Sequence, residues 1–308
     1  MEMKGTLALY TTVYPGVEPY LPEWYRSVRA QTDQDFRLWM GLDAVSADAV
    51  RDVLGTDPGA VCVAAHTGDA PAQVRQRALA QIVDAHDAVV LVDSDDVLYP
   101  SRVASARAAL QESDVAACAL RVVDGQGRDL GLTFALPSPG GADAVLPRNN
   151  IFGLSNSSFR TAVLRRCLPI PGDAVMVDWY LATLAWLLGA RFRADAEIGM
   201  AYRQYGTNTA RVLPPYEPAQ VTRDTERVRQ HFARVRSAAP EAASADRLEA
   251  VKRAAAEVDV FYRRVVLQPA VFERYLVDLN ALEPAPHWWA CVAHPALRQM
   301  WAPARSLS

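Results

Sequence analysis

Three closely spaced carboxylates follow an apolar run in the segment VVLVDSDDVLYP, residues 89–100. Residues two apart in an extended chain point to the same side, so Asp93 and Asp95 can face one site, with Asp96 beside them. Two carboxylates that close repel each other, and a divalent cation removes that repulsion. Hard oxygen ligands suit Mn²⁺ or Mg²⁺, especially where a diphosphate supplies further oxygens. The segment therefore indicates a metal site at Asp93 and Asp95.

Two other interpretations of the same carboxylates stay open at this point. An Asp-rich turn can cap the helix expected from Ser101 onward. Asp93, Asp95 and Val97 also match the Asp-x-Asp-x-Val signature of phosphatases of the haloacid dehalogenase type. That class uses a downstream lysine, and no lysine occurs between the motif and Lys252. The absence of this lysine makes the phosphatase interpretation the weaker one.

The segments that position these acids alternate between strand and helix patterns. Strands are expected at 6–13, 36–42, 60–65, 88–93 and 115–123, and helices at 18–31, 46–54, 70–83 and 101–111. This alternation predicts an α/β fold with a mostly parallel, Rossmann-like sheet covered by helices on both faces. Ligands of such sheets bind beyond the carboxyl ends of the strands, where the acids lie.

The sequence pattern becomes mainly helical after about residue 212. A turn at 124–127 suggests a hairpin, 137–150 is either a mobile flap or a bare connector, and 191–205 suggests two short strands. Helices are expected at 178–188, 220–235, 244–267 and 270–282. We therefore predict a catalytic domain over 1–212 and a helical region over 213–308 that serves packing, oligomerisation or the acceptor side.

Composition limits the partners of the chain. Its 308 residues are half apolar and carry a net charge of −3, which gives no electrostatic case for nucleic acid. The four cysteines are widely spaced, as expected of reduced thiols, and no apolar run is long enough for a membrane span. The N-terminal residues do not resemble a signal peptide. We expect a soluble, cytoplasmic protein.

Several segments, in order along about residues 5–210, resemble family 2 glycosyltransferases of the GT-A fold. They are SVRAQTDQDFRLWMGLD, DAVSAD (43–48), VRQRAL (74–79), LVDSDDVLYP (91–100), FGLSNSSFR (152–160) and YRQYGTNTA (202–210). The chain departs from the family at Ala44 and Val45, beside the expected base-recognition contact. It also has Tyr205 where the family has histidine.

The resemblance implies a GT-A fold and transfer of a sugar, with inversion, from a nucleotide-diphosphate sugar to an acceptor hydroxyl. It implies Mn²⁺ or Mg²⁺ as cofactor and a place in glycan or polysaccharide synthesis. The sugar, the nucleotide base and the acceptor are not readable from the sequence. The alternative is a non-catalytic nucleotide- or glycan-binding module on the same fold, which would lack the metal pair or the base.

Donor-side residues follow from strand ends and from the resemblance. Asp93 is expected on the ribose or a metal-bound water, and Asp95 on the metal. The substrate-binding set expected beside them is Thr11, Thr12, Tyr14, Asp43, Arg75, Asn156, Trp179, Arg203 and Tyr205. Arg75 either faces the phosphates or is a plain surface arginine. Tyr205 is expected to act by packing within a phosphate-side lid, since a phenol is a poor ligand for these cations.

Direct attack by a sugar hydroxyl requires a general base. The resemblance places that base at the start of a helix, where this chain offers Asp178. A helix cap is the alternative role for Asp178, and Asp173 is the next candidate base. Trp179 beside it either stacks on an acceptor ring or belongs to the core.

Two features are left with open roles. His66 either approaches the site or is a structural histidine. The aromatic C-terminal segment, with Trp288, Trp289 and Trp301, is expected to pack on the catalytic domain. A homodimer contact is the second possibility for this segment, and shallow, peripheral membrane contact is the third.

Overall fold

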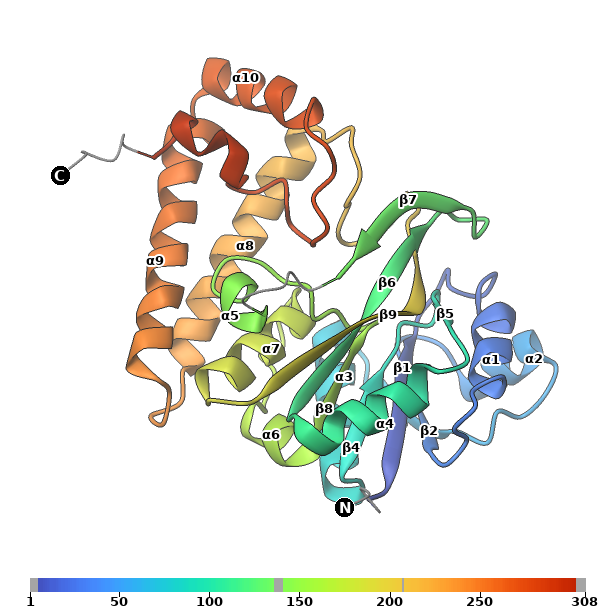
Figure 1. Ribbon diagram of the computed structural model, residues 1–308. Coiled ribbons are helices and arrows are strands. Elements are labelled where there is room, and N and C mark those ends of the chain that lie inside the picture. Colours follow the sequence, from blue (N-terminus) through green and yellow to red (C-terminus); the bar gives the residue numbers. More distant parts are fainter. Residues whose placement is uncertain (1–4, 136–140, 207, 303–308) are drawn as a thin grey trace.

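The computed structural model describes residues 5–135, 141–206 and 208–302. Within them, nine strands form one mixed sheet in the order β3-β2-β1-β4-β8-β6-β9-β5, with β7 paired to β6 (Figure 1). The strands are β1 (Leu7–Val13), β2 (Arg37–Leu42), β3 (Val61–Ala64), β4 (Ala88–Leu91), β5 (Val97–Leu98), β6 (Val115–Val123), β7 (Asp129–Phe134), β8 (Ser157–Arg160) and β9 (Phe192–Arg203).

Helices cover this sheet and form the C-terminal part of the chain. They are α1 (Leu21–Arg29), α2 (Ala47–Leu54), α3 (Pro71–Ala85), α4 (Arg102–Glu112), α5 (Gly141–Val145), α6 (Thr161–Arg166), α7 (Val177–Leu187), α8 (Pro218–Ala238), α9 (Ala245–Phe261) and α10 (Pro269–Asn280). In Figure 1, α4 lies in front of the strands, where it packs on β6, β8 and β9. α3 packs on β2 and β3 and contacts α6.

The parallel half of the sheet brings three strand ends to one edge. β1 pairs in parallel with β2 on one side and with β4 on the other. The pairing continues past the strands, since the Asp43 amide donates to the Val13 carbonyl at 2.9 Å and the Val92 amide to the Tyr10 carbonyl at 3.0 Å. Residues that follow β1, β2 and β4 therefore meet at the same edge, as the alternating pattern predicts.

The antiparallel half differs in detail from the sequence prediction. β8 inserts between β4 and β6 and runs antiparallel to both, which places the segment before β8 beside the end of β4. Residues 191–205 were expected to form two short strands, but they form the single strand β9. The strand is continuous but irregular, with register shifts against β6 between Cys118 and Leu120.

Helix α7 is almost entirely buried. All its residues except Asp178 are buried, and it packs on both α8 and α9. A helix that is apolar on all sides belongs in an interior. Asp178 is therefore a polar exception on an otherwise buried helix, and its neighbours decide what it can do.

The C-terminal helices α8, α9 and α10 gather beside the sheet (Figure 1). The predicted helix over 244–267 ends as an α-helix at Phe261 and continues as a π-helical turn, Tyr262–Val266. Within the described ranges, none of the helices combines the length and apolarity that a membrane crossing requires. The division at residue 212 stays a prediction, and it falls between the end of β9 and the start of α8.

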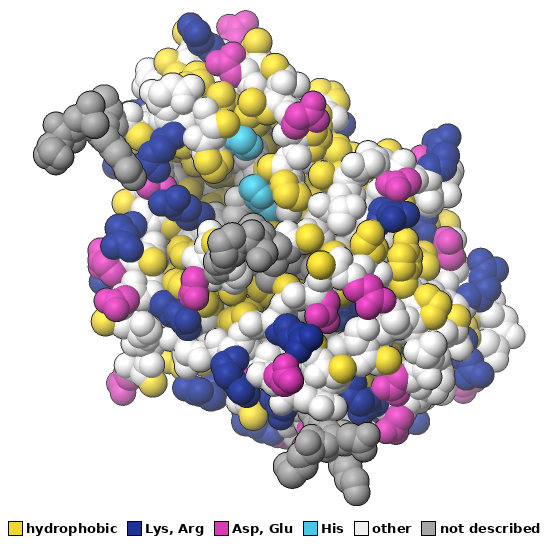
Figure 2. Space-filling view, in the orientation of Figure 1, with side chains coloured by type: hydrophobic (Ala, Val, Ile, Leu, Met, Phe, Trp, Pro, Cys, Tyr) yellow, Lys and Arg dark blue, Asp and Glu magenta, His cyan; other side chains and the backbone are white. Residues whose placement is uncertain are grey.

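The aromatic C-terminal segment packs inward. The Trp288 ring lies 4.9 Å from the Phe134 ring and 5.5 Å from the Tyr202 ring, both edge to face. Trp301 packs against Phe261, and Trp289 is also buried. Figure 2 shows apolar side chains between the C-terminal helices and the sheet, with acidic and basic groups interspersed below. Of the expected flap over 137–150, residues 137–140 lie outside the described residues and Gly141–Val145 form α5.

Candidate active site

Asp93 and Asp96 share one serine. The Ser155 hydroxyl, which precedes β8, donates to the Asp93 carboxylate at 2.8 Å and also contacts the Asp96 carboxylate. Asp96 is 1% exposed and accepts from the Arg203 amide at 2.7 Å. Burial, then the charges of Asp95 and Asp93, raises the pKa of Asp96 well above its usual range. A protonated Asp96 can donate a hydrogen bond to the Ser155 hydroxyl, which in turn donates its own proton in a hydrogen bond to Asp93.

Asp95 is held by two phenols. The Tyr205 hydroxyl donates to the Asp95 carboxylate at 2.6 Å, and the Tyr14 hydroxyl donates to the same oxygen at 3.3 Å. Burial, and then the Asp95 charge, raises the pKa of both tyrosines, so both remain proton donors. The sequence predicted packing alone for Tyr205. The structure adds a direct hydrogen bond from its hydroxyl to the carboxylate expected to bind the metal.

Arg203 supports this arrangement from inside the protein. Its guanidinium is 2% exposed and donates to the Asp95 carbonyl at 2.8 Å, to Gly125 and to the Glu23 carboxylate at 2.8 Å. It also stacks on the Tyr20 ring, which lies 5.1 Å from Tyr205. With these donors used within the protein, Arg203 is placed to fix the loop of Asp95 rather than to contact a phosphate.

Asp178 lies in the first turn of α7 and is partly exposed. Its carboxylate accepts from the Asn150 side-chain amide at 2.9 Å. Burial and, after it, the Asp93 charge raise the pKa of Asp178 to about 6, while hydrogen bonds from backbone amides and the Arg75 charge act in the opposite direction. The helix cap is Met176, so Asp178 is not the N-cap residue. A carboxylate with a pKa near neutrality suits a general base.

Arg75 contributes the positive charge of the site. Among the described residues, its guanidinium makes no hydrogen bond or ion pair, and its Nε is buried without a partner. Burial raises the pKa of Asp93 and of Asp178, and the Arg75 charge opposes that rise at both. Arg75 therefore faces the carboxylates, which favours the phosphate-side interpretation over that of a surface arginine.

The residues expected to line the nucleoside pocket at the end of β1 differ in their exposure to the site. Tyr14 reaches Asp95, whereas Thr12 is buried, with its hydroxyl 3.1 Å from the Tyr10 hydroxyl. Thr11 is fully buried and its hydroxyl has no partner among the described residues. Asp43 is partly exposed after β2, and its charge adds to the rise in the Tyr10 pKa that burial causes. Tyr14 and Asp43 are thus the more accessible of the expected nucleoside contacts.

Two further expected substrate contacts are in the interior. The Asn156 amide donates to the carbonyls of Cys118 and Ile151, both at 3.0 Å, and is 2% exposed. Trp179 is fully buried and stacks on His231 at 4.1 Å. Neither presents a surface to a sugar, so their expected role changes from substrate contact to support of the site.

The remaining candidates are engaged elsewhere. The Asp173 carboxylate pairs with the Arg234 guanidinium at 2.6 Å on the surface. The Arg77 guanidinium donates to His66 Nδ1 at 3.1 Å and also to the Asp69 carboxylate, so His66 has a structural environment. Sequence reasoning did not find Ser155, Asn150 or Tyr10. Ser155 and Asn150 are brought to the site by tertiary contacts rather than by a local pattern, whereas Tyr10 lies on β1, two residues from Thr12.

The described residues contain no group of three or more Asp, Glu, His or Cys side chains arranged to hold a metal. The donor set of Asp93 and Asp95 nevertheless fits a hard divalent cation, because both are carboxylates and burial with the Asp95 charge raises the pKa of Asp93 to about 6. Buried like charges of this kind are relieved by a cation. Two protein carboxylates suffice where a diphosphate completes the coordination.

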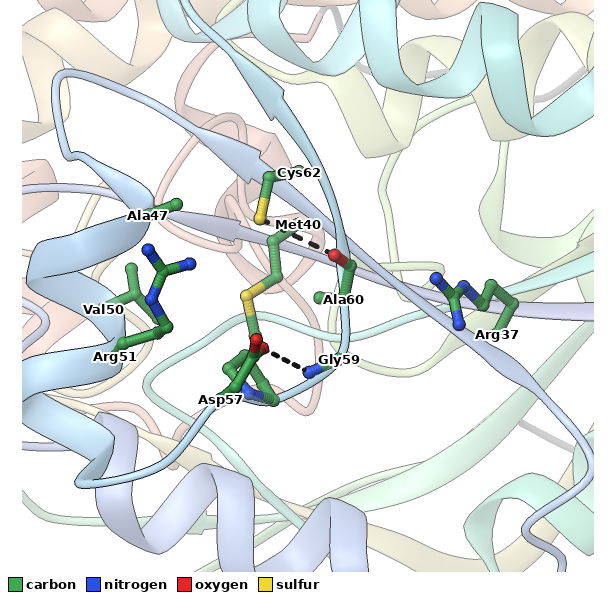
Figure 3. A pocket seen from close by; sticks show the side chains of 10 residues that line it. Arg37, Met40, Ala47, Val50, Arg51, Asp57, Gly59, Ala60 and Cys62 are labelled. Atoms are coloured by element: carbon green, nitrogen blue, oxygen red, sulfur yellow. Dashed lines mark hydrogen bonds between the residues drawn. The ribbon is translucent and has the colours of Figure 1, made fainter.

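A separate cavity of about 220 Å³ lies between β2, β3 and α2. Met40, Cys62 and Arg37 line it, and Arg37 lies apart from the other two in the view of Figure 3. Arg51 at its rim forms an ion pair with Asp48. None of the carboxylates of the candidate site lines this cavity.

The fold is that of known glycosyltransferases. The chain is similar to S. aureus TarS 1-349, with a TM-score of 0.57, 15% identity and coverage of 89% of this chain and 78% of that chain. It is similar to the mannosyltransferase PcManGT from Pyrobaculum calidifontis in complex with GDP-Man and Mn²⁺, with a TM-score of 0.58, 16% identity and coverage of 96% and 79%.

A third solved structure, S. aureus TarS 1-349 in complex with UDP-GlcNAc, gives a TM-score of 0.54 at 16% identity and covers 84% of this chain and 91% of that chain. No protein-family model matches the sequence, and no curated protein matches it. At these identities the similarity shows the fold, and it confirms the predicted GT-A type α/β class.

Proposed function

We propose that this protein is an inverting glycosyltransferase that uses a nucleotide-diphosphate sugar, as the resemblance to family 2 implies. One observation carries the proposal: Asp178 lies close enough to Asp93 for the Asp93 charge to act on it, and burial raises the pKa of Asp178 to about 6. The edge of the sheet that binds ligands in such folds therefore holds both a pair of acids for a cation and a base near neutrality.

The chain's own residues divide the reaction between them. The acceptor hydroxyl oxygen forms a bond to the anomeric carbon, the bond from that carbon to the diphosphate oxygen breaks, and the hydroxyl proton passes to the Asp178 carboxylate. Arg75 is positioned to meet negative charge on the departing diphosphate. Tyr14 and Asp43 line the nucleoside side. Asp173, already paired with Arg234, is the second candidate base.

Asp93 and Asp95 would hold Mn²⁺ or Mg²⁺ against the diphosphate. When bound, such a cation supplies charge neutralisation for the leaving group. Ser155, Tyr14 and Tyr205 orient the two carboxylates by hydrogen bonds, so a cation meets a preformed pair. Because a structural neighbour was solved with GDP-Man and Mn²⁺, Mn²⁺ is the first cation to test.

The donor is tested with a panel. Structural neighbours were solved with UDP-GlcNAc and with GDP-Man, so UDP and GDP sugars are the first candidates. We expect one nucleotide diphosphate to raise the melting temperature in the presence of Mn²⁺, because a ligand at 100 times its dissociation constant stabilises by about 2.7 kcal/mol. The matching nucleotide sugar should be hydrolysed slowly without acceptor.

Binding without any hydrolysis across UDP, GDP, CDP and dTDP sugars would instead favour a non-catalytic binding module.

We further propose a glycan or other hydroxyl acceptor and a cytoplasmic site of action. The helical region, residues 213–308, would support the acceptor side.

A further inference from the structure

Asn150 is the one described side chain outside α7 that donates a hydrogen bond to Asp178. It is fully buried, and it lies far from Asp178 in sequence, ahead of β8. The sequence motifs do not mark it. Its burial and its contact suggest a role in holding the proposed base.

The orientation of the Asn150 amide is fixed by its other partners. Its side-chain oxygen accepts from the Phe152 backbone amide at 2.9 Å. The oxygen is therefore directed at an obligatory donor, and the NH₂ group must point toward Asp178. In this orientation the Asn150 NH₂ group is a donor to the Asp178 carboxylate, which stabilises the ionised form, and it also donates to the Phe152 carbonyl at 3.4 Å.

The Asn150 backbone is fixed by the C-terminal segment. Its carbonyl accepts from the Trp288 amide at 3.2 Å, and the two residues form an antiparallel bridge. The Trp288 ring packs closely on Gly153, where an added Cβ would lie 2.6 Å from the ring. Trp288 also packs on Phe134 and Tyr202, so the segment is anchored on several sides.

We infer that Asn150 is a positioning residue that orients Asp178 and keeps it ionised at neutral pH, and that the C-terminal segment holds Asn150 in place through Trp288. The inference rests on the proposed role of Asp178 as base. Two other charged groups face Asp178, Asp93 beyond β4 and Arg75 on α3, and they act in opposite directions on it. Asn150 supplies a donor that does not depend on either.

The test measures the pKa of Asp178 in the full chain by ¹³C NMR of labelled aspartate carboxyls, with Asp178→Asn to assign the signal. The variants are Asn150→Ala and Asn150→Leu, which removes the donor while retaining most of the volume. Asn149→Ala is the matched control, because Asn149 is adjacent and makes no hydrogen bond to Asp178. We expect both Asn150 variants to raise the pKa by about one pH unit or more, and the control to leave it unchanged.

An unchanged pKa of Asp178 in a folded Asn150 variant would overturn the inference. If neither variant folds, the test uses the parent protein. The ¹⁵N chemical shift of its Asn150 side-chain amide should change with pH at the midpoint of the Asp178 titration. In Asp178→Asn the same shift should not change with pH. An amide that does not follow Asp178 would also overturn it.

Activity gives an independent reading. The acid limb of donor hydrolysis should move to higher pH in Asn150→Leu by the same amount as the pKa. Should the parent hydrolyse no nucleotide sugar, the proposed function fails, while the NMR titration still decides whether Asn150 controls Asp178.

Discussion

The two acidic centres of the site are supported in different ways. Asp95 is contacted by Tyr14, Tyr205 and Arg203, which come from separate parts of the chain. Asp178 depends on the single side-chain donor Asn150, which is itself tied to the C-terminal segment. The acid proposed to bind the cation is thus held by the sheet domain, whereas the proposed base is linked to the helical region. Changes on the first side should affect binding, and changes on the second should affect turnover.

The largest effect is expected from Asp95→Ala. Removal of this carboxylate leaves Asp93 alone for the cation and leaves two phenols without their acceptor. We expect loss of Mn²⁺-dependent nucleotide diphosphate binding and of donor hydrolysis, and EDTA should produce the same result in the parent. Calorimetric titration with and without Mn²⁺ measures it, and Asp48→Ala, an exposed surface acid, is the control. Full activity in excess chelator would exclude the cation from the account.

The pH dependence should report the base. The pKa of Asp178 is raised to about 6, and a base acts only when ionised. Turnover at saturating donor and Mn²⁺ should therefore rise with pH through about 6, level off above neutrality and be lost as the pH falls below that value. A flat profile between pH 5 and 7 would contradict the assignment of Asp178.

The smallest effect is expected from Tyr205→Phe. The ring still packs on Tyr20, and Tyr14 still donates to the same oxygen of Asp95. A hydrogen bond to a charged group contributes about 1.5–3 kcal/mol, and the remaining donor should keep the loss toward the lower end. The dissociation constant for the Mn²⁺–nucleotide complex should change by roughly tenfold. A loss as complete as that of Asp95→Ala would give Tyr205 a larger role than we assign.

Sequence reasoning located the strand-end residues but not their supports. Asp93, Asp95 and Asp43 could be placed because parallel strands bring their carboxyl ends to one edge. Ser155 could not, because it reaches Asp93 only through insertion of β8 beside β4, 62 residues away along the chain. Local sequence patterns do not show which distant strands pair.

The burial of two side chains, Trp179 and Arg203, could also not be predicted from the sequence. Trp179 directly follows Asp178 and could have faced either the acceptor or the core. The helix α7 is apolar on nearly all sides, and this favours the core, where the structure places the ring. Arg203 was expected near phosphate because of its motif, yet its donors are used by Asp95, Gly125 and Glu23. A motif identifies a loop without showing which of its side chains point outward.

The central claim is that binding and proton transfer are carried by separate acids, and Asp178→Asn tests it most directly. Asn retains the shape of Asp and removes only the proton acceptor. The account predicts an unchanged dissociation constant for the Mn²⁺–nucleotide diphosphate complex and a fall in turnover of roughly 10²- to 10⁴-fold, smaller if water replaces the acceptor. Parent-like turnover in a folded, nucleotide-binding Asp178→Asn protein would contradict it.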